Sequence, residues 1–528
     1  MHRLAAFLIT TASFAPDLIA QVRRNPTSPV SEYVDSRTCA ACHAEIAKKY
    51  ALTSMAKSVS PAGAASTVEV APALFEHSLS SRKYDIQSKA GQIVQRRTFT
   101  LTGDVYEQTG THVVGSGKNA RSYLHRAGSG ELSQLPLSWY SQSHQWSMSP
   151  GYDAPKHFDF SRQVDPGCLF CHTAYPTRME VVPSLTGGID CQRCHGPGSK
   201  HIGTGGSVKT IVNPAKLESS RRLDVCLQCH LQSTSDPLPH MVLRTDRNLF
   251  SFRPGESLSD YAVHLDRPSH SGEQRVEVNS HGYRLLASKC FLQTSGSIQC
   301  TSCHNPHGEV STSAVRERTQ AQCLSCHKPH ETFAKESCDS CHMPRVVARD
   351  APLVQVTDHR IQKPAKEHLR VKASEGPYKG ELLLYRSQGL RFAEEQLYLG
   401  IAYVEGGADR HKGLALLQAY PDRLPVSAVR ALATGLDKTG NLAGALPVYL
   451  RLTRSAEDLA LQADALQRSG RTNDAEARFE LALPLPQAHL GLAALLLSAG
   501  RPDLALEHWM KAASSVKTRS EALSNLGA

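Results

Sequence analysis

The sequence repeats the pattern Cys-x-x-Cys-His seven times, and this pattern constrains the fold more than any other feature. Such a pattern attaches c-type haem: the two thiols form thioethers to the porphyrin and the histidine ligates the iron. Zinc ribbons also use paired Cys-x-x-Cys. A histidine at the same position in all seven copies, however, indicates one shared requirement for that residue. We therefore predict seven covalent haems.

We number these motifs 1 to 7 in chain order. The predicted thioether-forming residues are Cys39, Cys42, Cys168, Cys171, Cys191, Cys194, Cys226, Cys229, Cys300, Cys303, Cys323, Cys326, Cys338 and Cys341. The predicted proximal iron ligands are His43, His172, His195, His230, His304, His327 and His342. The fifteenth cysteine, Cys290, is either a buried thiol near a haem or a reactive or intermolecular one.

Length and composition agree with a multidomain protein that folds around porphyrin. A chain of 528 residues is too long for a single ordinary core, while aromatic residues make up only 6%. The formal charge of +10 omits the haem propionates, which cancel roughly seven of those charges. Lys and Arg are dispersed along the sequence, without the clustered stripe of a nucleic-acid surface. We expect acidic redox partner proteins and no nucleic acid.

The N-terminus has the pattern of a secretory signal. An Arg precedes an apolar stretch that ends near Ala15, and residues 1–20 fit a signal peptide cleaved after Ala20. A frayed amphipathic helix is the alternative. We expect an exported, periplasmic protein, and one that is not transmembrane, because no other apolar run is long enough to cross a bilayer.

The predicted fold class is mainly α, with a haem-packed cytochrome domain over residues 31–375. Motifs 2 to 7 start at spacings of 23, 35, 74, 23 and 15 residues, and the repeated 23 suggests a two-haem module used twice. The segments between them are rich in Pro, Gly and Ser, so we expect few regular elements. Alternating residues interrupted by Gly predict a small β insertion over 68–140.

Residues 380–528 contain no cysteine and have a period of 30 residues. Gly440, Gly470 and Gly500 are each followed five residues later by alanine. A glycine that ends one helix and a small residue inside the next predict a helix-turn-helix solenoid of tetratricopeptide (TPR) type. A generic helical bundle is the alternative. A solenoid normally closes with a polar cap. Because the sequence stops as a new helix starts, we expect a truncated record or a partner over that end.

Several stretches resemble exported multihaem cytochromes related to the tetrahaem cytochromes of ammonia oxidisers and to hydroxylamine oxidoreductase. They are Gly188-Ile-Asp-Cys-Gln-Arg-Cys-His-Gly-Pro-Gly-Ser-Lys-His201, Cys300-Thr-Ser-Cys-His-Asn-Pro-His307, Ser337-Cys-Asp-Ser-Cys-His-Met-Pro-Arg345 and Thr357-Asp-His-Arg360. The resemblance covers roughly residues 31–365. No Cys-x-x-Cys-Lys is present, so the lysine-ligated catalytic haem of pentahaem nitrite reductases is not expected. We assign no catalytic residue.

The resemblance implies that a histidine beyond one motif ligates a neighbouring haem on its distal face, which assigns His201, His307 and His359 to that role. His330 repeats the arrangement of His307 within Cys-His-Lys-Pro-His. His125 and His157 are further candidates. For any of these, a surface or propionate contact is the alternative.

Motif 1 is isolated from the other motifs by 129 residues. The nearest ligand types are Met55 and His77, and Met55 lies at the end of the same helical pattern. A thioether ligand would raise the potential of this haem, while an empty face would make it the catalytic haem. Met55 as an ordinary packing residue is the third reading.

The predicted function is electron transfer through seven haems, with a protein partner docked on the TPR-like repeats. Two alternatives remain. One is an oxidoreductase that acts on a small nitrogen or sulfur compound at an open haem. The other is an interaction scaffold in which the haems report or regulate.

Overall fold

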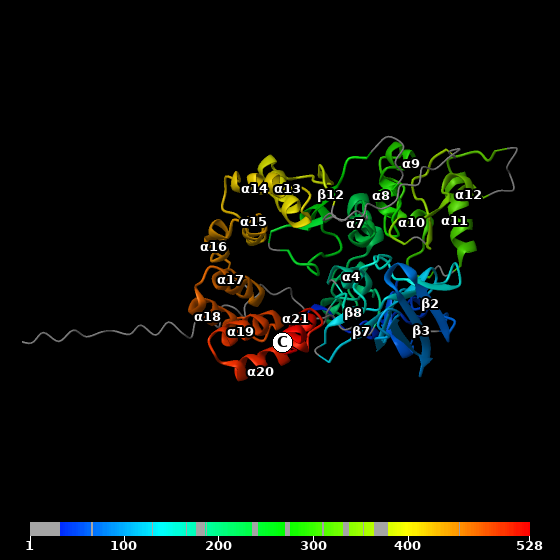
Figure 1. Ribbon diagram of the computed structural model, residues 1–528. Helices are drawn as coiled ribbons and strands as arrows, with labels where there is room; N and C mark the ends of the chain where they lie inside the picture. Colours follow the sequence, from blue (N-terminus) through cyan, green and yellow to red (C-terminus); the bar gives the residue numbers. More distant parts are fainter. Residues whose placement is uncertain are drawn as a thin grey trace, which may run out of the picture.

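The computed structural model describes residues 32–527 except 65–66, 129, 165, 176–184, 186, 235–240, 246, 270–274, 309–310, 331–336, 352, 364–377 and 453–454. The predicted signal peptide lies outside the described residues. Figure 1 shows the chain curving from a β region through the motif-bearing helices into a helical solenoid that returns to the β region. Among the described helices, none is both long and apolar enough to cross a membrane.

The β region is a sandwich of two antiparallel sheets and is larger than the predicted insertion. One sheet has the order β1-β6-β7-β9-β10, with β8 paired to β7, and the other has the order β2-β3-β4-β5. Its strands are β1 (Val59–Pro61), β2 (Ala73–His77), β3 (Arg82–Lys89), β4 (Gln92–Phe99), β5 (Val105–Thr109), β6 (His112–Val114), β7 (Ala120–Arg126), β8 (Leu132–Gln134), β9 (Leu137–Tyr140) and β10 (Gln145–Met148). The predicted bounds of 68–140 were therefore too narrow at both ends.

The two sheets enclose one apolar core. Tyr84 and Ile86 of one sheet pack in the same buried cluster as Tyr123, Trp139 and Trp146 of the other. The opposite face of the six-stranded sheet packs through Leu124 against Leu169. This second contact joins the sandwich to α4 (Pro166–His172), the helix that carries motif 2.

Short helices separated by loops form the motif-bearing region. They are α2 (Arg37–Ala40), α3 (Ala44–Tyr50), α4, α5 (Gln192–His195), α6 (Ser199–Gly203), α7 (Ser219–His230), α8 (His281–Leu286), α9 (Lys289–Gln293), α10 (Cys300–Cys303), α11 (Thr312–Leu324) and α12 (Cys338–His342). Two small sheets accompany them, β11 (Met241–Leu243), β12 (Ala262–Asp266) and β15 (Leu383–Tyr385), and the hairpin of β13 (Arg345–Val347) and β14 (Gln355–Thr357). The β content is therefore higher than a mainly α domain with one small insertion.

The C-terminal helices form the predicted helix-turn-helix repeats. They are α13 (Phe392–Gly406), α14 (Arg410–Gln418), α15 (Val426–Lys438), α16 (Leu442–Tyr449), α17 (Ala456–Arg468), α18 (Thr472–Leu481), α19 (Pro486–Ser498), α20 (Pro502–Ala513) and α21 (Arg519–Leu526). Gly440, with φ +85°, follows α15 in the left-handed conformation that glycine adopts readily. Ala445, Ala475 and Ala505 are each 0% exposed inside the following helix, as their spacing predicts.

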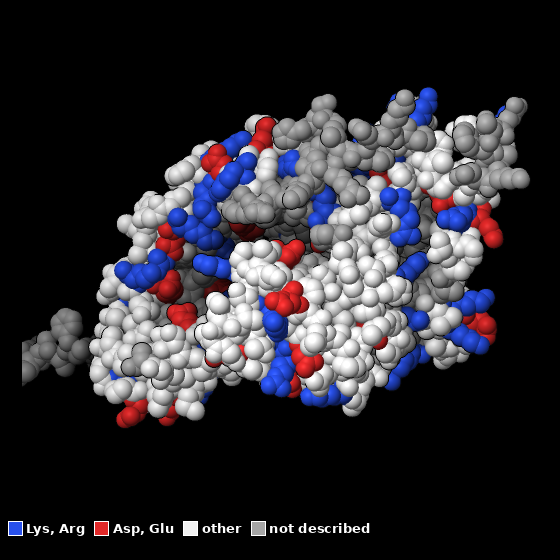
Figure 2. Space-filling view, turned by 45° about the vertical axis from the view of Figure 1, so that its right-hand side comes forward, with Lys and Arg blue, Asp and Glu red and all other residues white. Residues whose placement is uncertain are grey.

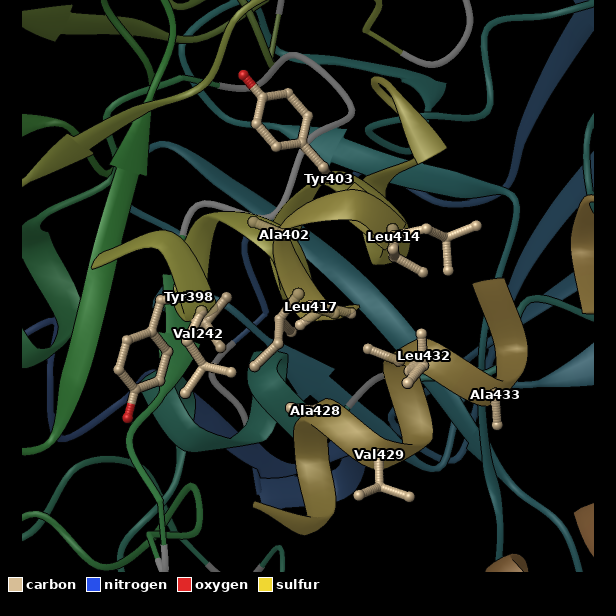
Figure 3. Packing of buried hydrophobic residues seen from close by; sticks show 14 of the residues in the cluster. Val242, Tyr398, Ala402, Tyr403, Leu414, Leu417, Ala428, Val429, Leu432 and Ala433 are labelled. Atoms are coloured by element: carbon tan, nitrogen blue, oxygen red, sulfur yellow. The ribbon is translucent and has the colours of Figure 1, made fainter. Parts of the chain in front are cut away.

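The solenoid shares its first core with the motif-bearing region. Leu265 on β12 lies in one buried cluster with Leu397 and Ile401 of α13, and β15 completes the sheet beside β12. Figure 3 shows this cluster, in which Val242 of β11 lies beside Tyr398 of α13. The segments on either side of the predicted boundary near residue 380 therefore pack in one core and pair in one sheet.

The far end of the solenoid contacts the β sandwich. The carboxylate of Glu131 accepts hydrogen bonds from Ser515 Oγ and from the backbone N–H of Val516, both at 2.6 Å. This segment of the chain therefore lies against its own β region. On the face in Figure 2, basic and acidic side chains are interspersed, and the surface is hollowed between the solenoid and the rest of the protein.

The shared core predicts that Leu265→Ala weakens the joint. Deleting a fully buried leucine side chain costs about 2–5 kcal/mol, so the guanidinium midpoint of the helical circular dichroism signal should fall. Leu383→Ala on β15 is the control, because Leu383 is 42% exposed and should cost far less. Equal midpoints for both variants would contradict the shared core.

Candidate functional site

Each described motif folds into a helical turn that brings its thiols and histidine together. The histidine N–H donates to the carbonyl of the first cysteine in motifs 1, 3, 5 and 6, at 3.0 Å for His43 to Cys39, 3.0 Å for His195 to Cys191, 2.9 Å for His304 to Cys300 and 2.9 Å for His327 to Cys323. Motifs 2, 4 and 7 lie within or at the ends of α4, α7 and α12. Residues four apart on a helix share one face, so a single group can bind the first cysteine and the histidine of a motif.

Five of the seven proximal histidines have a second imidazole across from them. The ring centres are separated by 6.4 Å for His43 and His201, 5.6 Å for His230 and His281, 5.9 Å for His195 and His307, 6.1 Å for His304 and His359, and 6.1 Å for His342 and His330. A metal–imidazole bond is about 2 Å long, so two imidazoles on opposite sides of one metal have ring centres roughly 6 Å apart. The donor set and its spacing fit a bis-histidine haem iron.

Backbone carbonyls orient several of these rings. A carbonyl oxygen accepts a hydrogen bond from Nδ1 in His195 (Val212, 2.7 Å), His201 (Ser207, 3.0 Å), His342 (Gln362, 2.8 Å) and His359 (Thr357, 2.9 Å). Because a carbonyl only accepts, Nδ1 carries the proton and Nε2 keeps its lone pair. This arrangement is typical of histidines that ligate a metal.

Burial keeps the central histidines neutral. It lowers the pKa of His172, His230, His281 and His307, and it lowers the pKa of His359 to about 4. Neutral imidazole is the form that binds a metal. The Nδ1 atoms of His172, His230 and His281 are also buried without a hydrogen-bond partner.

The thiols of different motifs lie against one another. Four pairs of thiols from different motifs interact electrostatically, Cys39 with Cys191, Cys171 with Cys229, Cys226 with Cys300, and Cys323 with Cys338. Weaker electrostatic contacts link Cys194 to Cys229 and Cys303 to Cys323. Motif 4 therefore has three neighbours, motifs 2, 3 and 5.

The structure brings His201 across from motif 1, which the sequence treated as isolated. Met55 takes part through its backbone carbonyl, which accepts hydrogen bonds from Ser58 and Ile189. The Tyr50 hydroxyl donates to the Ile189 carbonyl at 2.9 Å. Gly188 allows the two segments to approach closely, because a Cβ at this position would lie 2.6 Å from the Met55 carbonyl oxygen. The N-terminal motif is thus held beside motif 3, despite the long intervening sequence.

The structure places His157 in the β sandwich. Its Nδ1 accepts a hydrogen bond from the backbone N–H of Asp159 at 3.0 Å, and its Nε2 lies 3.3 Å from Arg82 Nη1, 3.3 Å from Ser80 Oγ and 3.4 Å from the Tyr84 hydroxyl. Burial lowers its pKa to about 4. Both ring nitrogens thus have partners inside the sandwich. His125 lies on β7, where Nδ1 contacts the Thr109 carbonyl at 2.9 Å.

Two histidines outside the predicted set lie near motifs in the structure. His281 begins α8, and its ring lies across from His230. His112 on β6 is the direct cross-strand partner of Leu124, on the sheet face that packs against the helix of motif 2. Neither histidine follows a motif closely, so only the tertiary contacts identify them.

Two comparisons concern the motifs. A family described as the doubled CXXCH motif matches residues 294–332, which include motifs 5 and 6. The chain is 23% identical over 201 residues to the multiheme cytochrome MtrA of Shewanella baltica (strain OS185), and the match covers 35% of this chain and 54% of MtrA. The chain thus spans about half the length of this relative. The resemblance to hydroxylamine oxidoreductase stays a prediction.

Solved structures also match part of the chain. MamA of AMB-1 is 26% identical, with 23% of this chain and 70% of MamA covered and a TM-score of 0.21. TTC0263, a thermophilic TPR protein in Thermus thermophilus, is 23% identical, with 26% and 83% covered and a TM-score of 0.22. Taken with the motif geometry, the doubled CXXCH match and the similarity to a multiheme cytochrome indicate that this chain carries c-type haem.

Proposed function

We propose that this protein is an exported electron-transfer protein that conducts through seven covalent haems. The imidazole pairs carry the proposal, because a histidine that follows one motif lies across from the proximal histidine of another. His201, after motif 3, faces His43 of motif 1, and His330, after motif 6, faces His342 of motif 7. Covalent haem, when bound, supplies an iron centre that gains and loses one electron. The similarity to a multiheme cytochrome supports the same role.

The contacts predict a branched order. Motif 1 adjoins motif 3, and motifs 2 and 3 both adjoin motif 4. From motif 4 the order continues through motifs 5, 6 and 7. Motif 4 is therefore the junction through which electrons from either branch pass.

Paired histidines favour conduction over catalysis. A second imidazole closes the distal face of an iron to small molecules, and five motifs have such a ring at ligation distance. We assign His201, His281, His307, His359 and His330 as distal ligands of motifs 1, 4, 3, 5 and 7. The helical repeats supply a surface for a redox or assembly partner.

A buried ion pair positions His359. Asp358, with a fully buried side chain, accepts hydrogen bonds from Arg284 Nε at 2.8 Å and Nη2 at 2.6 Å. Asp358 also accepts from the backbone N–H of Arg360 at 2.9 Å. This fork fixes the backbone on both sides of His359, so the imidazole is aimed before the haem is attached.

Intact mass of the mature holoprotein should account for seven covalent haems, because all seven motifs are complete. A mass with six or fewer haems, or zinc at these thiols by metal analysis, would contradict the proposed conduit.

His281→Ala should open one haem without preventing its attachment, because Cys226, Cys229 and His230 remain. We expect a new high-spin ferric signal and carbon monoxide binding equivalent to one haem. His508→Ala on α20 of the solenoid is the control and should leave both unchanged. Carbon monoxide binding by the reduced wild type would instead favour the alternative, an oxidoreductase acting on a small nitrogen or sulfur compound at an open haem.

Asp358→Asn should leave the Arg284 charge buried and unpaired, which costs about 3–5 kcal/mol of folding stability. The same variant should broaden or shift the low-spin resonance of one haem as His359 loses its fixed position. Glu76→Gln is the control, since its ion pair with Lys83 is more than half exposed on both sides. Thermal unfolding measures the loss of stability, and electron paramagnetic resonance measures the change at the haem. If Asp358→Asn and Glu76→Gln gave the same resonances, Asp358 would not position His359.

A further inference from the structure

Arg193 is a buried cation at the junction of the motifs. It lies between the two cysteines of motif 3, and its side chain is 1% exposed. The guanidinium carbon is 4.3 Å from the ring centre of Phe170 and 4.3 Å from that of Tyr175. Nη2 donates to the Phe170 carbonyl at 2.7 Å and is 3.8 Å from Cys229 Sγ. The side chain thus contacts a residue within motif 2, Phe170, and one within motif 4, Cys229.

No carboxylate among the described residues contacts the Arg193 side chain, and the Cys229 sulfur beside it would carry no charge as a thioether. Nε and Nη1 are buried without a hydrogen-bond partner. Tyr175 and Tyr33 are neutral, because burial raises the pKa of both hydroxyls. Asp190 binds the backbone N–H of Arg193 at 3.2 Å, and its other oxygen accepts from Gln192 and Ser36. The guanidinium therefore rests on aromatic faces and a single carbonyl.

The propionates of the haems at motifs 2 and 4 would lie on the porphyrin edge remote from the thioethers, whereas Arg193 lies against the thioether-forming residues of those two motifs. Charge–charge interactions are strong where water is excluded. A fixed positive charge stabilises the reduced iron, which carries one positive charge fewer than the oxidised iron, and so raises the reduction potential.

We propose that Arg193 tunes the junction haem: its buried positive charge raises the reduction potential of the haem at Cys226 and Cys229. The junction haem then holds the electron that arrives from either branch before it passes to motif 5. The same charge raises the potential of the haem at motif 2 by less, because Arg193 contacts the Cys229 sulfur directly and Cys171 only electrostatically. This inference rests on the proposed conduit and adds the place where electrons collect.

The test is a spectroelectrochemical titration of the holoprotein. Arg193→Gln retains a donor for the Phe170 carbonyl and removes the charge, and Arg193→Met removes both. We expect one of the one-electron steps to move to lower potential in both variants, with a smaller shift in a second step. Arg193→Lys retains the charge and should titrate like the wild type.

Arg253→Met is the matched control. Arg253 also lies over Tyr33 and Tyr175, at 5.0 Å and 5.6 Å, but its Nη1 donates to the carbonyls of Phe250 and Phe252. Its loss should leave every step unchanged. Neutral variants with seven haems and unchanged potentials overturn the inference. If the neutral variants lose haem, Arg193→Lys decides: wild-type potentials support the inference, and a lowered step overturns it. Haem number by intact mass tests the conduit separately.

Discussion

The helical turn of each Cys-x-x-Cys-His motif is the constraint on which the motif-bearing region depends. The turn fixes two thiols and an imidazole on one side of a short helix, as in His195, whose N–H bonds to the Cys191 carbonyl. The turns of different motifs lie close to one another, as the pairing of His43 with His201 shows. An apolar cluster around Phe170, Leu227 and Tyr261 packs beside them.

Local chemistry explains what could be predicted from the sequence. Gly440 and Ala445 act within a single helical hairpin, so their spacing alone indicated the turn and the close helix contact. The motifs are equally local. The partner of His230 is not, because His281 reaches it through the packing of α7 against α8. His201 likewise meets His43 through the contact of two segments that are far apart in sequence.

Other features were missed because short elements leave weak patterns. β1 and β15 have three residues each, which is too few to show alternation. β1 nevertheless extends the sandwich, and β15 pairs with β12 and so joins the C-terminal segment to the motif-bearing region. The surroundings of His157 depend in the same way on contacts between strands, because its Nε2 lies beside Arg82 and Tyr84 of β3.

The solenoid is anchored at two points, by the sheet that β15 completes and by the carboxylate of Glu131. An ordinary repeat array is free to flex, and its curvature changes when a partner binds. Here the two attachment points fix the curvature of the solenoid before any partner binds. A partner that fits the hollow therefore loses little ordering entropy on binding, and one that needs a wider or narrower arc has to break a contact within the protein first.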